Sequence, residues 1–237
     1  PFYISNPDFA DDHFQLHVWN NVIGSGAEDL AYRLANGGYK VVLSPVSNQY
    51  FDLAYNSSYF EPGLKWGGLV DIDKPYYFIP FDFLKNVKED GQGRPIKNLD
   101  QSKMIRLTDY GKSNIVGLQG LLWSENNVTT QRLEYMMLPK LLGLAERAWA
   151  KEPEWAKAEP SVLNDLYYEN EFSSFATILG KRELPRLTCY NGGYAYGSDP
   201  VSDSRPYAEL ISDKGKLRFA AFDVIGRRGR VMELENK

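Results

Sequence analysis

Residues 37–45, Gly37-Gly38-Tyr39-Lys40-Val41-Val42-Leu43-Ser44-Pro45, decide the fold class of this 237-residue chain. The two adjacent glycines are typical of the end of a helix, since glycine readily adopts the backbone angles found at a helix C-terminus. A mostly apolar run follows at once, and Ser44-Pro45 closes it, as is typical of a short buried strand. The stretch therefore predicts a helix that ends and a strand that begins within a few residues.

The segments upstream complete this unit. Ser25-Gly26-Ala27-Glu28 has the spacing of a capping box at the start of a helix. Leu30, Ala31, Leu34 and Ala35 then give that helix an apolar stripe. Phe14-Gln15-Leu16-His17-Val18-Trp19 alternates loosely between apolar and polar side chains and is expected as an earlier strand. Strand, helix and strand in this order predict an α/β fold with a parallel sheet.

Residues 45–112 differ from the rest because Gly, Pro, Asn, Asp and aromatic residues recur there without sustained periodicity. A loop of this length is usually functional or an inserted subdomain. Short helices are expected near 82–88 and 102–109. Residues 115–122 then predict a third buried strand.

The region after the third strand is expected to be helical. Thr129 or Thr130 begins a helix that extends to about Ala150, and Pro139 is expected to bend or break it. Another helix is expected from about Ser161 to Leu179, where Gly180 ends it. From Cys189 onward the composition favours short strands between turns, and these are expected at 194–196, 207–211, 216–223 and 230–234.

Composition excludes several classes of function. The net charge of −4 is opposite to the basic surface that nucleic acids require, and no apolar run approaches the length of a membrane span. His13 and His17 have no cluster of further ligands at metal spacing, so neither a metal nor a cofactor is expected. Cys189 is alone and leaves the compartment open. The start at Pro1 shows neither Met nor a signal peptide, so we expect a piece of a longer protein. A periplasmic or extracellular location is expected for the protein.

Aromatic and acidic residues gather where the predicted strands end. Trp19 ends the first strand, Tyr50 and Asp52 follow the second, and Trp123 and Glu125 follow the third, with Trp66 in the long loop between them. Taken singly, each has an ordinary explanation in packing, turn formation or solvation. Together they favour a site for a polyol, because sugars offer hydroxyl groups to carboxylates and C–H faces to indole rings. A local interpretation makes Asp52 and Glu125 an acid/base or acid/nucleophile pair.

At this point the sequence resembles glycoside hydrolase family 20, the β-N-acetylhexosaminidases, and within it the bacterial chitobiase-like enzymes. The resemblance covers roughly residues 13–187. It rests on an ordered series of motifs: Trp19-Asn20-Asn21, residues 37–45 as quoted above, Asn48-Gln49-Tyr50-Phe51-Asp52, Trp66-Gly67-Gly68, Gly117 to Glu125, Leu138-Pro139-Lys140 and Ala145-Glu146-Arg147-Ala148-Trp149.

The resemblance implies a fold and a set of roles. Residues 1–187 would be the later strands and helices of a (β/α)8 barrel, and 188–237 a small, shortened immunoglobulin-like β domain. The 2-acetamido group of the substrate would attack its own anomeric carbon, in the substrate-assisted exception to two-carboxylate hydrolysis. By resemblance, Tyr50 would be catalytic and hold the acetamido oxygen. The substrate-binding residues would be Trp19, Trp66 and Trp123 as walls, with Asp52 and Glu125 gripping sugar hydroxyls.

One departure limits this expectation. The adjacent Asp-Glu of the family, in a His-x-Gly-Gly-Asp-Glu motif, is absent from the sequence, because Glu28-Asp29 and Glu89-Asp90 have the reverse order and lack the motif. We therefore expect the activity, exo-acting release of terminal N-acetylglucosamine from chito-oligosaccharides or glycans, to belong to the parent protein and not to this chain alone. The expected partners are such an oligosaccharide and either a second copy or the missing N-terminal half.

Two alternatives remain open. The chain could belong to a non-catalytic N-acetylglucosamine-binding or scaffold protein that keeps the aromatic residues. It could also be a structural protein that uses these rings for packing only, in which case the three tryptophans would be buried apart from one another.

Overall fold

The computed structural model describes residues 8, 10, 13–19, 23–87, 89–90, 94–96 and 100–197, except for the side chains of Leu163 and Asn191. It also describes the backbone of residues 215–222 and 228–236. The strands are β1 (Gln15–Val18), β2 (Lys40–Leu43), β3 (Ile115–Leu118), β4 (Gly215–Phe222) and β5 (Arg228–Asn236). The helices are α1 (Leu30–Asn36), α2 (Val46–Gln49), α3 (Asp73–Tyr77), α4 (Asp109–Lys112), α5 (Thr130–Met137), α6 (Lys140–Trp149), α7 (Glu154–Lys157), α8 (Val162–Ile178) and α9 (Leu184–Cys189).

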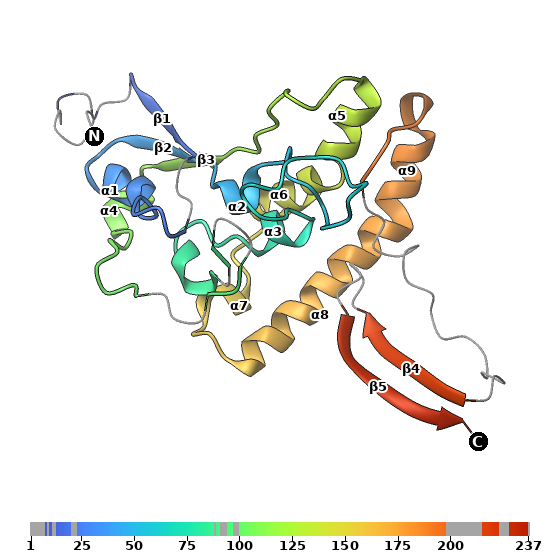
Figure 1. Cartoon of the computed structure of the whole chain (residues 1–237). Coiled ribbons are helices and arrows are strands. Elements are labelled where there is room, and N and C mark those ends of the chain that lie inside the picture. Colours follow the sequence, from blue (N-terminus) through green and yellow to red (C-terminus); the bar gives the residue numbers. More distant parts are fainter. Residues whose placement is uncertain are drawn as a thin grey trace.

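The three N-terminal strands form one parallel sheet in the order β1-β2-β3 (Figure 1). Helix α1 crosses over from β1 to β2, and Gly38 follows it with a φ of 94°. The N–H of Tyr39 donates to the carbonyl of Leu34 at 3.1 Å, and that of Gly38 to the carbonyl of Ala35 at 3.0 Å, which is the Schellman arrangement. The predicted βαβ unit is confirmed, and the glycine pair turns the chain from α1 into β2.

The start of α1 differs from the prediction. The helix begins at Leu30 after Asp29, and Ser25 and Glu28 do not form a capping box. The carboxylate of Glu28 instead accepts from the backbone N–H of Gly24 at 2.6 Å. The positive φ of Gly24 and Gly26 folds this segment into a turn, in which the hydroxyl of Ser25 accepts from the N–H of Ala27 at 3.3 Å and not from the helix.

The long connection between β2 and β3 contains short helices. The 3₁₀ turn at Phe83–Asn86 lies where a helix was predicted near 82–88. The helix predicted near 102–109 is wrong: α4 begins only at Asp109, where Thr108 accepts from the N–H of Gly111 at 3.0 Å. α2 and α3 were not predicted, because four or five residues are too few to show helical periodicity.

The helical region after β3 agrees with the prediction at its first two boundaries. Pro139 separates α5 from α6, and Thr129 caps α5 by accepting from the N–H of Arg132 at 3.1 Å. Gly180, however, does not end α8. The chain continues through a π-helical turn, Leu179–Glu183, into α9, so that α8 and α9 follow one another along one side of the molecule (Figure 1).

The C-terminal strands β4 and β5 form a two-stranded antiparallel sheet, which confirms strands near 216–223 and 230–234. Residues 194–196 are not a strand, although one was predicted there, and 207–211 lie outside the described residues. The immunoglobulin-like domain and a boundary at 187/188 stay predictions, and α9 runs across that boundary.

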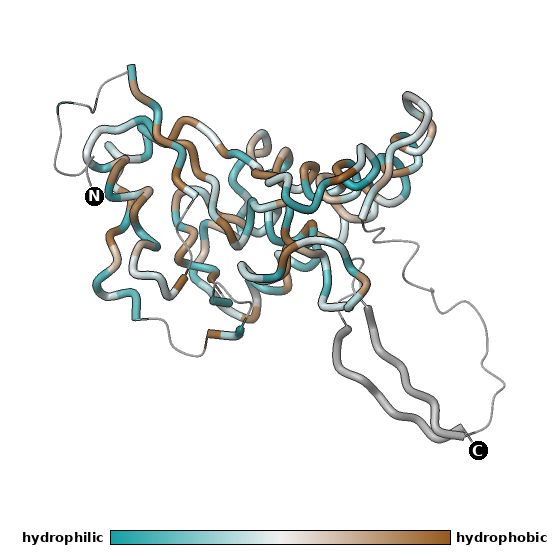
Figure 2. The backbone as a smooth tube through the Cα atoms, turned by 45° about the horizontal axis from the view of Figure 1, so that its top comes forward, coloured by the Kyte–Doolittle hydropathy of each residue, from teal (hydrophilic) through white to brown (hydrophobic). Residues whose placement is uncertain are grey.

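Burial gives the sheet a well-defined core. Apolar stretches recur along the sheet and the helices around it (Figure 2). Tyr32, Val41 and Leu84 belong to the cluster beneath α1, and α3 packs on α6, where Ile72 and Leu138 join a second cluster. Among the described helices, none combines the length and the apolar character that a membrane crossing needs.

Candidate active site

Three segments that are distant in the sequence meet at the carboxyl end of the sheet. Trp19 follows β1 directly, and Trp123 comes five residues after β3 ends. Tyr50 returns to the sheet after the short helix α2 and forms a parallel bridge with Leu121. The N–H of Phe51 donates to Leu121 at 2.7 Å, and that of Leu121 donates to Gln49 at 2.8 Å. This bridge places Tyr50 beside the chain that leads to Trp123.

The four predicted rings form a continuous cluster. The ring centre of Tyr50 lies 6.0 Å from that of Trp66 and 6.2 Å from that of Trp123. The ring centres of Trp123 and Trp19 are 6.1 Å apart. All three contacts are edge-to-face, the arrangement that aromatic pairs favour. We call Trp19, Tyr50, Trp66 and Trp123 the ring cluster.

The ring cluster is exposed at its indoles and buried at its phenol. Trp19, Trp66 and Trp123 are 48%, 53% and 42% exposed, whereas Tyr50 is 2% exposed. The purely structural alternative predicted three tryptophans buried apart from one another, and it is wrong. The half-exposed indoles therefore form an open surface around a buried phenol.

Backbone hydrogen bonds connect the loop that carries Trp66 to the segment that carries Asp52. The N–H of Leu64 donates to the carbonyl of Asp52 at 2.9 Å, and the N–H of Ala54 donates to that of Leu64 at 2.8 Å. Gly63 allows this close approach with a φ of 107°, since an added Cβ would lie 2.9 Å from the carbonyl oxygen of Asp52. The position of Trp66 is therefore coupled to that of Tyr50 and Asp52.

The hydroxyl group of Tyr50 is set up as a hydrogen-bond donor. Burial, which is the largest cause, and the nearby Asp52 together raise the pKa of Tyr50 to about 12, although the polar side chain of Trp123 lowers it. The phenol thus stays protonated at all physiological pH values. A protonated phenol can donate this proton to an acceptor that a ligand brings.

Asp52 is a buried carboxylate with little local support. It is 4% exposed, and neither carboxylate oxygen has a hydrogen-bond partner of normal geometry among the described residues. Burial raises the pKa of Asp52, and the neighbouring carboxylate of Glu125 raises it further. The backbone N–H groups of Asp52 and Trp123 and the charge of Lys140 lower it. Two unsatisfied acceptors next to an aromatic surface suit a ligand that brings hydroxyl groups.

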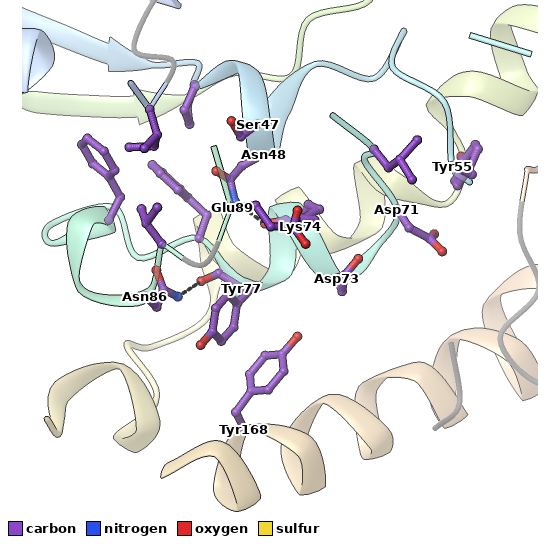
Figure 3. Close-up of a pocket in the computed structure, with 16 residues that line it drawn as sticks. Ser47, Asn48, Tyr55, Asp71, Asp73, Lys74, Tyr77, Asn86, Glu89 and Tyr168 are labelled. Carbon is purple, nitrogen blue, oxygen red and sulfur yellow. Dashed lines mark hydrogen bonds and ion pairs between the residues drawn. The ribbon is translucent and has the colours of Figure 1, made fainter. Parts of the chain in front are cut away.

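A separate cavity of about 410 Å³ is lined by side chains of α2, of α3 and of residues 83–87 and 89, with Tyr168 of α8 (Figure 3). Lys74 and Glu89 form an ion pair of 2.6 Å in its wall, and the amide of Asn86 donates to the carbonyl of Tyr77 at 2.5 Å. No member of the ring cluster lines this cavity. It is therefore distinct from the candidate site.

In the part of the chain that the structure describes, no group of three or more His, Cys, Asp or Glu side chains could hold a metal ion. His17 is exposed and shares a hydrogen bond of 2.6 Å with the side chain of Gln119. The arrangement consists of aromatic rings, one hydroxyl donor and two carboxylates.

A family model described as "Glycosyl hydrolase family 20, catalytic domain" matches residues 3–152, which is more than half of the chain. The chain belongs to glycosyl hydrolase family 20.

Bacterial hexosaminidases and a chitobiase are among the proteins that the chain resembles. A "Beta-hexosaminidase" of Vibrio vulnificus is 30% identical over 189 residues, which are 72% of this chain and 21% of the relative. An "N,N'-diacetylchitobiase" of Vibrio harveyi is 26% identical over 193 residues, 76% of this chain and 20% of the relative. A "Beta-hexosaminidase B" of Pseudoalteromonas piscicida is 35% identical over 158 residues, 65% of this chain and 19% of the relative. The chain thus spans about a fifth of the length of these relatives.

The fold agrees with the family. A solved structure titled "A Glycoside Hydrolase Family 20 beta-N-Acetylglucosaminidase" superimposes with a TM-score of 0.51 at 22% identity and covers 76% of this chain and 31% of that chain. This likeness shows a shared α/β fold, in which the three parallel strands and their helices correspond to part of the family 20 catalytic domain.

The residues of the ring cluster were predicted from the sequence of this family 20 member, but the buried Lys140 was not. Lys140 is fully buried, and its ammonium donates to the carbonyls of Phe51 and Leu53. A signal was present, because the buried residues of α6 are Lys140, Gly143, Leu144 and Arg147, at helical spacing. A lysine and an arginine on the core face of a helix are unusual and require specific partners.

Proposed function

We propose that the chain forms the acetamide-binding part of a family 20 active site in a parent protein that releases terminal N-acetylhexosamine from chito-oligosaccharides or similar glycans. The single observation that carries the proposal is the ring cluster, in which one buried hydroxyl donor lies among three half-exposed indoles. This combination suits an N-acetyl group, whose methyl is apolar and whose carbonyl oxygen accepts a hydrogen bond.

Tyr50 has the central role in this proposal. Its hydroxyl donates to the acetamido oxygen of the substrate and holds that oxygen for attack on the anomeric carbon. The attack forms the C–O bond of an oxazolinium ring as the bond to the leaving oxygen breaks, and water later reopens the ring with net retention. The raised pKa of Tyr50 supports this role, because a phenol that keeps its proton stabilises the geometry without competing as a base.

The surrounding residues bind and orient the sugar. Trp19, Trp66 and Trp123 present edges and faces to the acetamide and the pyranose ring. Asp52 and Glu125 accept hydrogen bonds from sugar hydroxyls, and we assign them this role in place of an acid/base pair. The unsatisfied carboxylate of Asp52 supports the assignment.

The proton for the leaving group has another source in this proposal. The His-x-Gly-Gly-Asp-Glu motif is not in the 237-residue sequence, so we assign proton transfer to another part of the parent protein, in the barrel to which residues 1–187 contribute. Residues 188–237 would form the C-terminal β domain. We place the parent protein in the periplasm or outside the cell, which cell fractionation would test.

Tyr50→Phe in the complete gene product tests the assignment. Phenylalanine keeps the ring contacts with Trp66 and Trp123 and removes only the hydroxyl, so turnover of p-nitrophenyl N-acetyl-β-glucosaminide should fall about 10²–10³-fold. Tyr190→Phe, an exposed tyrosine outside the ring cluster, is the matched control and should keep wild-type turnover. Near-wild-type turnover of Tyr50→Phe would remove Tyr50 from the mechanism.

The second candidate function is non-catalytic binding of N-acetylglucosamine. The absence of the Asp-Glu motif from this sequence favours it. A complete gene product that binds a thiazoline mimic of the intermediate but hydrolyses no N-acetylhexosaminide would support binding over catalysis.

A further inference from the structure

The backbone around Asp52 is held by one buried ammonium group. Lys140, the first residue of α6, is 0% exposed. Its Nζ donates to the carbonyl of Phe51 at 2.9 Å and to that of Leu53 at 2.6 Å. These two carbonyls belong to the residues before and after Asp52, so a single side chain holds the backbone on both sides of the carboxylate.

The rest of the Lys140 environment is also ordered. Nζ lies 3.8 Å from the ring centre of Tyr55, a cation–π contact, and the Tyr55 hydroxyl donates to the carbonyl of Leu138 at 2.6 Å. Tyr55 therefore links the loop after Asp52 to the chain just before α6. These contacts enclose the ammonium group completely.

The charged groups that face Lys140 all come from the loop after β2. Asp71, Asp52 and Glu61 each favour the charged ammonium, and the hydroxyl of Tyr135 binds Glu61 at 3.0 Å. No carboxylate lies within 4.0 Å of Nζ among the described residues, so Lys140 acts on Asp52 through its field and through the backbone and not through an ion pair.

We propose that Lys140 is a positioning residue of this site: it fixes the Phe51–Leu53 backbone so that Tyr50 and Asp52 keep their geometry. Its positive charge also favours the ionised form of Asp52. This inference rests on the proposed function, and no feature of the ring cluster itself requires it. Lys140 is fully buried, and the ring and the two carbonyls that its ammonium group contacts do not belong to the ring cluster, so Lys140 would not touch a bound sugar.

The two parts of this role respond differently to pH. Burial lowers the pKa of Lys140 to about 7, although the three nearby carboxylates raise it. A neutral amine still has two N–H groups and can donate to both carbonyls, so the backbone stays in place when the proton leaves. The field on Asp52 is lost, because it depends on the charge alone.

Three variants of the complete gene product separate these effects. Lys140→Met removes both donors and charge, and Lys140→Arg retains both. Arg147→Met is the matched control, because it removes the other buried cation from the same face of α6, where Arg147 lies over Tyr76 and Trp155 at 5.4 and 5.3 Å. kcat and KM for the p-nitrophenyl substrate are measured from pH 4 to 9.

The expected results are specific to Lys140. Lys140→Met should lower kcat/KM by about 10–100-fold, since small displacements of positioned groups have effects of this size. Its acidic limb should move to higher pH, because Asp52 loses the charge that favours its ionisation. Lys140→Arg should restore the limb, and Arg147→Met should leave it unchanged. An unaltered limb and unaltered kcat/KM in Lys140→Met would overturn the inference.

A second measurement keeps this test separate from that of the proposed function. If the wild-type protein hydrolyses no N-acetylhexosaminide, the proposed function fails, and the Lys140 inference is then decided by an NMR titration of the Asp52 carboxyl group. The pKa of Asp52 should be higher in Lys140→Met than in wild type, and equal values would overturn it. If Lys140→Met does not fold, Lys140→Gln, which removes the charge but keeps two N–H donors, is titrated in its place.

Discussion

Asp52 combines burial, a neighbouring carboxylate and unsatisfied oxygens, and its pKa is raised as a result. Between the unfolded value near 3.8 and this raised value, the folded chain binds more protons than the unfolded chain. The free energy of unfolding therefore falls as pH rises through that interval. At neutral pH the folded protein holds an ionised group that its environment disfavours, which is common where function and stability conflict.

Asp52→Asn should therefore stabilise the chain at neutral pH while it weakens sugar binding. The amide has nearly the same shape without the charge, and each 1 kcal/mol gained raises Tm by roughly 2–4 °C. The gain in Tm should vanish near pH 3, where the carboxyl group of Asp52 is protonated in wild type and is as uncharged as the amide of the variant. Asp100→Asn is the control: Asp100 is exposed, hydrogen bonds from Ser102 lower its pKa, and its substitution should give no gain. Equal Tm values for wild type and Asp52→Asn at pH 7 would contradict this.

Single residues at strand ends were predictable, and the residue that supports them was not. Trp19, Tyr50 and Trp123 follow apolar runs whose periodicity is clear, so their shared edge of the sheet could be inferred. The role of Lys140 depends on the path of two carbonyls in an irregular loop, which has no periodicity. The sequence shows that Lys140 and Arg147 lie on the same face of the predicted helix, but it does not show which groups they contact.

At the scale of elements, the contact between α3 and α6 depends on a glycine. A Cβ added to Gly143 would lie 2.7 Å from the carbonyl oxygen of Ile72 and 3.2 Å from the ring of Pro75. Because the first neighbour is backbone, the two helices would have to separate. Lys140 belongs to the same helix, so a shift of α6 also reaches the site.

Gly143→Ala should accordingly destabilise the chain by about 1–3 kcal/mol in urea unfolding. The sign is informative, because alanine is otherwise preferred to glycine in a helix by about 1 kcal/mol. Gly117→Ala in β3 is the matched control, since its added Cβ would meet Val42 at an ordinary 4.0 Å. A stabilised Gly143→Ala variant would show that α3 and α6 are not closely packed there.

Elements with a clear period and a clear end were predicted correctly. The strands of the parallel sheet and the division at Pro139 follow from β-branched residues, glycines and a proline. α2 and α3 escaped prediction because they are shorter than two turns. The continuation past Gly180 escaped it because a π-helical turn has no sequence signature comparable to a left-handed glycine.

At the scale of the whole molecule, we expect the 237-residue chain to bind a mimic of the sugar intermediate but not to hydrolyse a substrate. It carries the ring cluster but not the Asp-Glu motif, so the purified 237-residue chain should hydrolyse no p-nitrophenyl N-acetyl-β-glucosaminide under conditions in which the complete gene product does. Calorimetric titration with a thiazoline mimic should still detect binding. Turnover by the isolated chain that Tyr50→Phe abolishes would show that the proton donor lies within these residues.

The edge-to-face pair of Trp19 and Trp123 has an optical consequence. Two indoles 6.1 Å apart with an angle of 67° between their planes are close enough for their electronic transitions to couple. Such coupling gives a near-ultraviolet circular dichroism signal that depends on the mutual orientation of the two chromophores. Assembly of this part of the protein can therefore be followed spectroscopically without any ligand, and loss of the signal on heating marks the temperature at which the strand ends separate.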